Sequence, residues 1–231
     1  MTSLEFRDRL ARRARRAKAP LTLAMLTPLE AYFRLLALWN SKINLTALPL
    51  DSPTDETFDR LLVEPLAAAP HLTWGARAGT RYHDDPGVWF DLGSGGGSPA
   101  IPLLIARPAL NLTMIESKTR KAAFLREAVR AVGLTSSAVV LNDRFEDAAR
   151  TAVHRQAADV VTVRAVKADE SLFSVAGQLL KKEGHLFLFR PAHDASPNPR
   201  GFTRIATIPL NDAPPSFLSS YRRVFHVEQT G

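Results

Sequence analysis

The sequence predicts an α/β fold in which a mainly parallel, twisted sheet carries helices on both faces and a helical cap precedes it. Short apolar runs alternate with helix-length segments over residues 88–190. The runs are apolar along their whole length, which is typical of parallel strands that are covered on both faces. A glycine-rich stretch joins the first run to the first helical segment, as in a Rossmann-like nucleotide-binding unit.

The bulk composition restricts the classes of function. The chain has 231 residues, 45% of them hydrophobic, which allows one large domain and a short appendage. It contains no cysteine, which excludes disulfides, thiolate metal sites and cysteine nucleophiles. No apolar run has transmembrane length, and the N-terminus is too charged for a signal peptide. We therefore expect a cytoplasmic protein with no membrane partner.

Basic residues are concentrated near the N-terminus. The formal net charge is +7, and residues 5–18 hold seven basic side chains against two acidic ones. A basic surface favours a polyanionic partner, so we predict a basic arm over residues 1–20 that binds RNA phosphates. A solvated, partly disordered tail is the alternative.

Residues 21–87 are predicted to form a helical cap. The sequence Thr-Pro-Leu-Glu at 27–30 has the pattern of a helix start, with a capping threonine, a proline in the first position and a capping-box glutamate. A second apolar face recurs over residues 58–69, where Pro65 should kink or divide the helix. Residues 75–87 are rich in Gly, Arg and Asp and form the predicted boundary.

The main domain, residues 88–231, alternates strands and helices. The predicted strands are 88–92, 112–115, 138–141, 160–163 and 186–189, and the predicted helices are 101–106, 119–132, 145–153 and 170–180. Gly133 is a natural stop for the second of these helices. Two later segments, 204–208 and 220–227, should add antiparallel strands.

The stretch 88–104, VWFDLGSGGGSPAIPLL, carries the strongest ligand signal. Its strand contains Asp91, a loop with Gly93, Gly95, Gly96 and Gly97 follows, and Ser98 and Pro99 open a helix. Glycines let a ligand approach the backbone, and the start of a helix presents free N–H groups. The NAD fingerprint fits imperfectly because its third glycine falls on Ser98, and no P-loop sequence is present.

Two carboxylates favour a cationic ligand over a dinucleotide. Glu116 follows the second predicted strand, about where an acid binds the ribose of an adenosine. Asp91 would repel a pyrophosphate, but it suits a ligand that has positive charge and no phosphate. S-adenosylmethionine, with a sulfonium, an ammonium and an adenosine, is such a ligand. We therefore expect this cofactor ahead of NAD.

Further candidates lie beyond the carboxyl ends of the strands, where such sheets bind ligands. Phe145 and Glu146 follow the third strand and could meet an adenine, or they could simply pack at a helix start. Arg164 ends the fourth strand. It could hold a guanine or the donor, or form a structural ion pair with a nearby acid. The candidates for RNA contact are Asn44, Lys118, Arg120, Lys121 and Arg190.

The side chains that the sequence contains restrict which atom could accept the methyl group of S-adenosylmethionine. C5 of a pyrimidine generally requires a cysteine nucleophile, and none is present. Exocyclic amines often require an Asp/Asn-Pro-Pro-aromatic motif, whereas this position reads Arg-Ala-Val at 164–166. N7 of guanine carries a free lone pair and needs no general base. The six histidines form no cluster, so neither a base nor a metal site is indicated.

The glycine stretch closely resembles the signature loop of the RsmG (glucose-inhibited division protein B) methyltransferases. The resemblance covers about residues 28–190 and includes Trp39-Asn40, Asn44-Leu45-Thr46, Arg107-Pro108, Glu116-Ser117, Lys121, Phe124-Leu125 and Arg164-Ala165. It implies a cytoplasmic bacterial enzyme that methylates N7 of a guanine in the 530 loop of 16S ribosomal RNA. The same matching makes Gly93, Ser98, Phe145, Glu146 and Arg164 donor-site positions.

The sequence departs from this family at three places. An Arg-His-x-x-Asp-Ser run in the second helix reads Arg-Leu-Leu-Val-Glu-Pro at 60–65, a Lys-Gly after the fifth strand reads Arg190-Pro191, and Ser98 is commonly a larger apolar residue. These changes leave the donor site in place and bear on RNA recognition. We expect a monomer that acts on 16S RNA or the small subunit without a metal. The alternatives are an NAD-dependent oxidoreductase and a non-catalytic RNA-binding protein.

Overall fold

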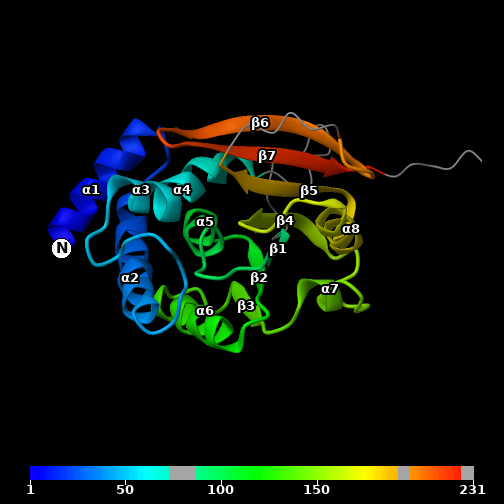
Figure 1. Ribbon diagram of the computed structural model, residues 1–231, viewed down its shortest axis with the longest axis horizontal. Coiled ribbons are helices and arrows are strands. Elements are labelled where there is room, and N and C mark those ends of the chain that lie inside the picture. The colour runs from blue at the N-terminus through cyan, green and yellow to red at the C-terminus, as the bar shows by residue number, and fades with distance from the viewer. Residues whose placement is uncertain (73–86, 192–197, 225–231) are drawn as a thin grey trace, which may run out of the picture.

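A seven-stranded sheet with the order β3-β2-β1-β4-β5-β7-β6 forms the centre of the protein. The computed structural model describes residues 1–72, 87–191 and 198–224. Strands β1 to β5 are parallel, and β7 runs antiparallel to both β5 and β6. Helices cover both faces of the sheet, and further helices cap one end (Figure 1). The predicted α/β fold is therefore confirmed.

The parallel strands occur where continuous apolar runs predict them. They are β1 (Val88–Leu92), β2 (Asn111–Ile115), β3 (Ala138–Leu141), β4 (Ala158–Arg164) and β5 (Leu180–Arg190). β1 and β4 lie between neighbouring strands and are mostly buried, as expected for strands covered on both faces. β5 begins directly after a helix, earlier than predicted, and its pairing with β4 shifts register between Ala158 and Val160.

The last two strands form a long antiparallel pair. The strands are β6 (Phe202–Asp212) and β7 (Pro215–Arg223). β6 continues beyond the predicted end at residue 208, and β7 begins before the predicted start at residue 220. They extend from the α8 end of the molecule across to the cap (Figure 1). Residues 225–227 of the predicted final strand lie outside the described residues.

The helices of the main domain largely match the predicted segments. They are α5 (Ala100–Ala106), α6 (Thr119–Ala131), α7 (Phe145–Ala148) and α8 (Glu170–Leu179). Gly133 has φ +74° just after α6, as its predicted role as a stop requires. The predicted length of α7 was wrong. The Thr151 hydroxyl donates to the Ala148 carbonyl at 2.8 Å, and this local bond competes with continuation of the helix.

The cap is built from α2 (Leu23–Asn40), α3 (Asp55–Phe58), a π-helical turn η1 (Asp59–Val63), α4 (Glu64–Ala68) and a 3₁₀ turn η2 (Ala69–His71). The predicted start of the first cap helix was wrong, since α2 begins at Leu23 and contains Pro28. Thr27 and Glu30 do not cap the helix and instead contact Arg7, at 3.4 Å in each case. The side chains of Thr27 and Glu30, which the local pattern assigns to a helix cap, thus bind α1 instead.

Pro65 divides the second apolar segment, as predicted. A proline has no N–H to donate to the carbonyl four residues earlier, which here is Leu61. The segment passes through the π-helical turn η1 before Pro65, and the Ser98 hydroxyl donates to the Leu61 carbonyl at 2.9 Å. The glycine-rich stretch thereby supplies the donor that the cap helix lacks.

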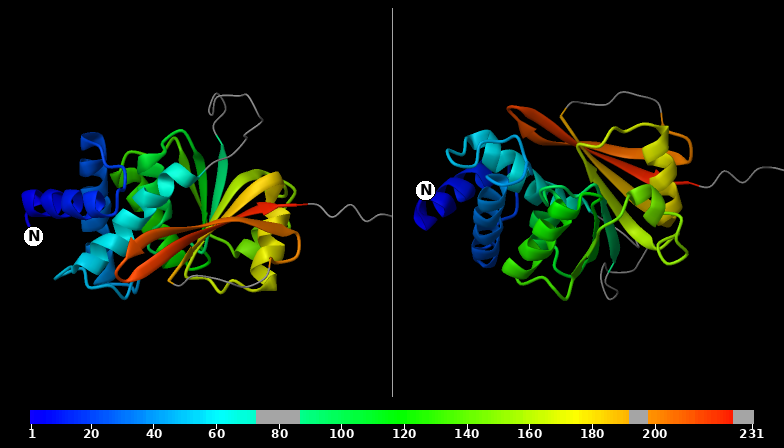
Figure 2. Two further views of the ribbon diagram at one scale, coloured as in Figure 1. Left: turned by 90° about the horizontal axis from the view of Figure 1, so that it is seen from above. Right: turned by 60° about the horizontal axis from the view of Figure 1, so that its bottom comes forward.

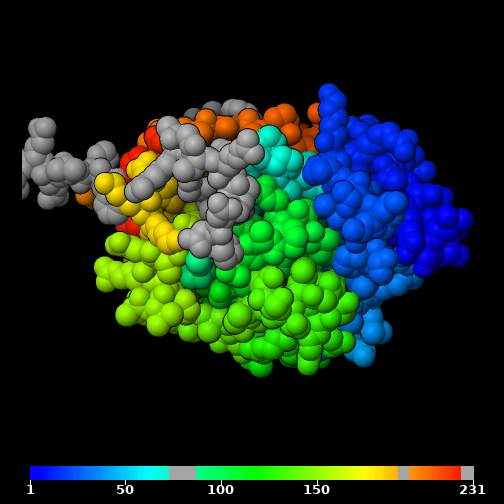
Figure 3. All heavy atoms as spheres, turned by 180° about the vertical axis from the view of Figure 1, so that it is seen from behind, coloured from blue at the N-terminus to red at the C-terminus, as the bar shows by residue number. Residues whose placement is uncertain are grey.

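Residues 1–20 do not form the arm or the disordered tail that their charge suggests. They contain α1 (Ser3–Arg16), whose Phe6 is fully buried in a cluster with Phe33 and Phe58. The buried Arg13 pairs with Asp59 through Nε and Oδ1 at 2.8 Å. Figure 3 shows this N-terminal part as one contiguous block beside the main domain. The helix is therefore part of the folded cap.

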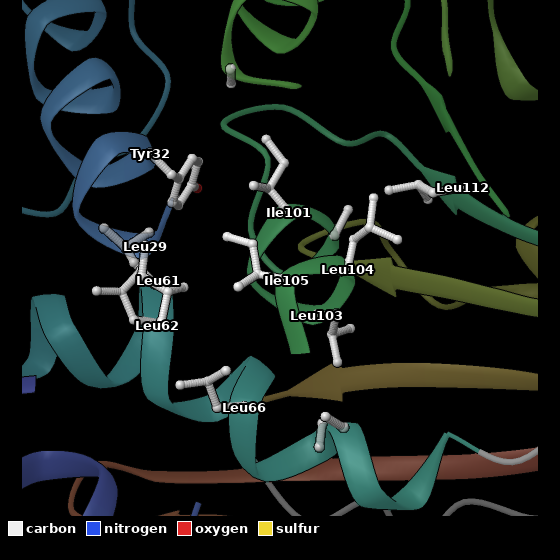
Figure 4. Packing of buried hydrophobic residues seen from close by; sticks show 14 of the residues in the cluster. Leu29, Tyr32, Leu61, Leu62, Leu66, Ile101, Leu103, Leu104, Ile105 and Leu112 are labelled. Carbon is white, nitrogen blue, oxygen red and sulfur yellow. The ribbon is translucent and has the colours of Figure 1, made fainter. Parts of the chain in front are cut away.

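Helix α5 lies between the cap and the sheet. Ile101 and Ile105 point toward Tyr32 of α2 and Leu61 of η1, whereas Leu104 lies beside Leu112 of β2 (Figure 4). All of these residues belong to one buried hydrophobic cluster that joins cap and sheet. The further views show α2 and the α3–α4 segment together at one end of the molecule (Figure 2). This packing fixes the cap over the end of β1, where the glycine loop begins.

Two absences within the described ranges, 1–72, 87–191 and 198–224, bear on the site. None of their helices is long and apolar enough to cross a membrane. None of their His, Asp and Glu side chains gather in a group of three that could hold a metal ion. The boundary predicted at 75–87 falls, apart from Gly87, outside the described residues.

Candidate active site

A cavity of about 620 Å³ lies where the cap meets the carboxyl ends of the parallel strands. Its walls come from the glycine loop after β1, from residues 45–48 of the cap, and from the residues at or after the ends of β2, β4 and β5. Ligands of open parallel sheets bind at this edge. The volume falls within the range of about 300–1,000 Å³ that is usual for small-molecule sites.

The glycine loop is held against the cap. The Tyr32 hydroxyl, on α2, donates to the Gly96 carbonyl at 2.7 Å. A Cβ atom at Gly96 would stand 3.2 Å from the Leu45 carbonyl oxygen, so this position has little room for a side chain. Gly93 and Gly95 have φ of +68° and +51°, which favours glycine. The loop thus presents bare backbone to the cavity.

Glu116 is fixed at the cavity wall directly after β2. Its Oε2 accepts from the Gly95 N–H at 2.9 Å, and its Oε1 accepts from the Lys118 N–H at 2.8 Å. The side chain is 6% exposed and lines the cavity. Each carboxylate oxygen has a further lone pair, so the group can also accept hydrogen bonds from a ligand. The sequence predicted this placement, and the structure adds that the same carboxylate shapes the glycine loop.

Asp91 is buried beneath the loop and is not among the residues that line the cavity. The Thr162 hydroxyl donates to its carboxylate, and the Trp89 indole N–H donates to the Thr162 hydroxyl at 2.8 Å. Burial raises the pKa of Asp91 to about 6, against the opposing effect of its hydrogen bonds. The carboxylate is therefore a buried negative charge at neutral pH, close to the site without facing it.

Arg164 ends β4 and reaches into the cavity, and it also forms the ion pair that the sequence left open. Its Nη2 donates to Oε2 of Glu64 at 2.7 Å, and its Nη1 donates to the Ser98 hydroxyl at 3.2 Å and to the Arg60 carbonyl. The guanidinium lies 4.6 Å from the ring centroid of Phe189. Burial lowers the pKa of Arg164, and Glu64 opposes that shift. The side chain is thus held rigidly on several sides.

The structure brings together only some of the predicted site residues. Those that line the cavity are Gly93, Gly95, Ser98, Glu116, Lys121, Arg164 and Arg190. Those that do not are Asn44, Asp91, Gly97, Lys118, Arg120, Phe145 and Glu146.

Several residues outside the cavity wall have other contacts. A Cβ at Gly97 would stand 2.7 Å from Ile101 Cδ1, which makes this glycine a packing requirement of α5. Glu146 lies 3.5 Å from Arg144 Nε. Asn44, Lys118 and Arg120 are exposed. Their surface positions are compatible with contacts to a large ligand that extends beyond the cavity.

The contribution of the cap to the cavity was not predicted from the sequence. Arg60 and Glu64 line the cavity one helical turn apart, with Arg60 Nη1 3.3 Å from Glu64 Oε1. The signal was the Arg-x-x-x-Glu spacing in the altered run 60–65, which places both side chains on one helix face. Tyr32 carried no comparable signal, because an aromatic residue on an apolar helix face indicates only core packing.

Proteins of known family match this chain in sequence. A sequence model of the family described as rRNA small subunit methyltransferase G (GidB) matches residues 25–198. The ribosomal RNA small subunit methyltransferase G of Xanthomonas axonopodis pv. citri (strain 306) is 36% identical over 183 residues, which are 78% of this chain and 77% of the relative. That of Xylella fastidiosa (strain 9a5c) is 39% identical over 168 residues, 72% of this chain and 69% of the relative.

Solved structures resemble the fold at lower identity. A Haemophilus influenzae protein described as a methylase has a TM-score of 0.50 and 18% identity, covering 61% of this chain and 81% of its own. Mitomycin 7-O-methyltransferase MmcR has a TM-score of 0.50 and 20% identity, covering 60% of this chain and 49% of its own. These likenesses concern the fold alone, which is Rossmann-like and of the class I methyltransferase type.

Proposed function

This chain belongs to the rRNA small subunit methyltransferase G (GidB) family, and we propose that it methylates N7 of a guanine in the 530 loop of 16S ribosomal RNA. The enzyme acts as a cytoplasmic monomer on the small ribosomal subunit or its RNA. The observation that carries the proposal is one cavity that joins a glycine loop and a fixed carboxylate to a group of cationic side chains.

The glycine-loop side of the cavity fits S-adenosylmethionine. When bound, this donor supplies an electrophilic methyl group on a sulfonium. Glu116 presents a carboxylate with free lone pairs, which suits the two hydroxyls of a ribose. The bare backbone at Gly93 and Gly95 permits close approach of the donor. The buried charge of Asp91 favours a cationic ligand over a pyrophosphate.

The opposite side of the cavity suits an RNA base and its phosphates. Arg60, Arg164 and Arg190 line this side of the cavity together with one acid, Glu64, so its wall carries an excess of positive charge. Cationic side chains position the phosphate backbone of RNA. Residues 45–48 of the cap also line the cavity.

The residues at the cavity agree with a reaction that needs no general base. No histidine lines the cavity within the described residues. Its two carboxylates, Glu64 and Glu116, already hold cationic or N–H partners. N7 of guanine attacks with a free lone pair, so the protein has only to align acceptor and donor. Arg164 stays protonated and therefore acts by positioning.

The decisive experiment maps the methylated nucleotide. The protein is incubated with labelled S-adenosylmethionine and small subunits that lack the modification, and the position of the label in 16S RNA is determined. We expect methylation of one guanine of the 530 loop at N7. Label at another nucleotide or atom would contradict the proposal, and absence of label would favour a non-catalytic RNA-binding protein. Calorimetry with S-adenosylmethionine and with NAD tests the oxidoreductase alternative, which predicts binding of NAD.

A further inference from the structure

The Glu64 side chain is buried in the cavity wall with one oxygen that lacks a hydrogen bond. It is 1% exposed, and Oε2 accepts from Arg164 at 2.7 Å. Oε1 has no hydrogen-bond partner among the described residues, although Arg60 Nη1 lies 3.3 Å away as an ion-pair neighbour. Buried polar atoms nearly always have a hydrogen-bond partner, because an unsatisfied one is costly. A hydrogen-bond donor on a bound ligand would satisfy this oxygen.

The order of strands divides the cavity into two sides. β1 lies between β2 and β4, and β5 lies beyond β4. Glu116 follows β2, whereas Arg164 ends β4 and Phe189 is near the end of β5. The carboxylate proposed to bind the donor therefore lies on one side, and the Arg164–Glu64 pair lies on the other. Glu64 is thus placed toward the methyl acceptor.

The contacts of Arg164 give the sequence of groups along the acceptor side. Its Nη1 donates to Ser98 of the glycine loop, and its Nη2 donates to Glu64. The hydrogen bonds therefore run in the order Ser98 of the glycine loop, guanidinium of Arg164, carboxylate of Glu64. Along the edge of a guanine the order is N7, O6 and N1–H, which are an acceptor, an acceptor and a hydrogen-bond donor. The two orders complement each other when N7 faces the methyl group.

We propose that Glu64 is a specificity-determining residue that recognises guanine, with Oε1 accepting a hydrogen bond from the base N1–H while Arg164 donates to O6. The assignment rests on the proposed function. Adenine presents the opposite pattern, an amine at position 6 and an acceptor at N1, which leaves both the carboxylate and the guanidinium without a match. Enzymes that modify an extruded base commonly read it through this edge. Glu64 thus gives the site a means to reject adenine.

The test compares Glu64→Gln with wild type on small subunits whose 16S RNA carries guanosine, inosine or 2,6-diaminopurine at the target position. Inosine keeps O6 and N1–H, whereas 2,6-diaminopurine has an amine at position 6 and an acceptor at N1. Single-turnover rates are measured with saturating S-adenosylmethionine. We expect wild type to accept guanosine and inosine and to reject 2,6-diaminopurine. Glu64→Gln should lose about tenfold to a hundredfold in rate on guanosine, the worth of one charge-assisted bond.

The ratio of rates separates recognition from a merely structural role. If Glu64 only holds Arg164 in place, the substitution lowers the rates on guanosine and 2,6-diaminopurine alike, and that result overturns the assignment. A wild-type rate in Glu64→Gln overturns it as well. A collapse of the preference for guanosine, with donor affinity by calorimetry within about twofold of wild type, supports it.

A matched control and a second variant complete the test. Glu56 is also an acid one turn from Arg60, at 3.9 Å from Nε, but it is about half exposed and is not among the residues that line the cavity. Glu56→Gln should therefore keep the wild-type rates and preference. Glu64→Ala removes the carboxylate altogether and should also lose the preference for guanosine, which provides a second variant if Glu64→Gln does not fold. Wild-type protein that does not methylate guanine N7 would refute the proposed function itself and the assignment with it.

Discussion

Replacement of Asp91 by asparagine should make the stability of the protein less dependent on pH. In the native state this carboxylate is buried beneath the glycine loop, and burial raises its pKa from 3.8 to about 6. The native state therefore binds a proton at this group more tightly than the unfolded state does. Its stabilising contribution is fully present below about pH 4 and is lost as the pH rises through about 6.

The size of the effect follows from the shift in pKa. One unit corresponds to about 1.4 kcal/mol, so the rise to about 6 costs the native state roughly 3 kcal/mol once the group is ionised. The asparagine side chain of the variant has the same shape as aspartate and can still accept from the Thr162 hydroxyl, but it carries no charge. The unfolding free energy of Asp91→Asn relative to wild type should therefore rise by about 2–3 kcal/mol between pH 4 and pH 7.

Urea unfolding followed by tryptophan fluorescence measures this difference at several pH values. The dependence of unfolding free energy on urea should be the same for both proteins, which checks that the native fold is unchanged. A difference that does not vary between pH 4 and pH 7 would refute the reasoning. S-adenosylmethionine affinity gives an independent readout, because removal of the buried negative charge should weaken binding of a cationic donor at pH 7 even as stability increases.

Substitutions at three further positions test other contacts of the site and the cap. Glu116→Ala should weaken S-adenosylmethionine binding by about tenfold to a hundredfold in calorimetry, because charge-assisted bonds to the ribose are lost, and unchanged affinity in a folded variant would contradict the assignment. Arg164→Ala should lose most single-turnover activity. Arg164→Lys should recover little of it, since lysine lacks the planar fork of the guanidinium. Near wild-type rates in the lysine variant would mean that Arg164 contributes only its charge. Arg13→Ala should lower the unfolding free energy by about 3–5 kcal/mol, because the charge of Asp59 would remain buried with the Asn211 amide but without its cationic partner. A loss below about 1 kcal/mol in urea unfolding would count against this.

The parallel core of the fold was predictable because its signals are local. Continuous apolar runs identified β1 to β5, and the glycine loop with Glu116 identified the donor side of the cavity. The start of α2 was not predictable in this way. The pattern at 27–30 is a valid capping sequence, but contacts with Arg7 from another helix use the same side chains. Local propensity fails where a distant residue competes for the same groups.

The acceptor side of the cavity was less predictable because it depends on contacts between distant parts of the chain. Arg164 and Glu64 are 100 residues apart, and no periodic pattern links them. The sequence therefore left open whether Arg164 pairs with an acid or contacts a ligand, and in the structure it both forms the pair and lines the cavity. Arg164 can therefore form a structural ion pair and still contact a ligand, so the two interpretations are compatible.

The N-terminal helix shows how charge can conceal a structural role. Its arginines suggest an arm for RNA, yet Arg9 and Arg13 pair with Asp55 and Asp59, whereas Phe6 is buried in the aromatic cluster. Removal of the whole segment would therefore expose that cluster and leave carboxylates unpaired, so a loss of RNA binding could not be assigned to phosphate contacts. The exposed residues Arg12, Arg15 and Arg16 lie on the other faces of the helix. Replacing these three by glutamine keeps the buried face, and only a lower salt dependence of RNA binding in that variant would show that α1 contacts phosphate.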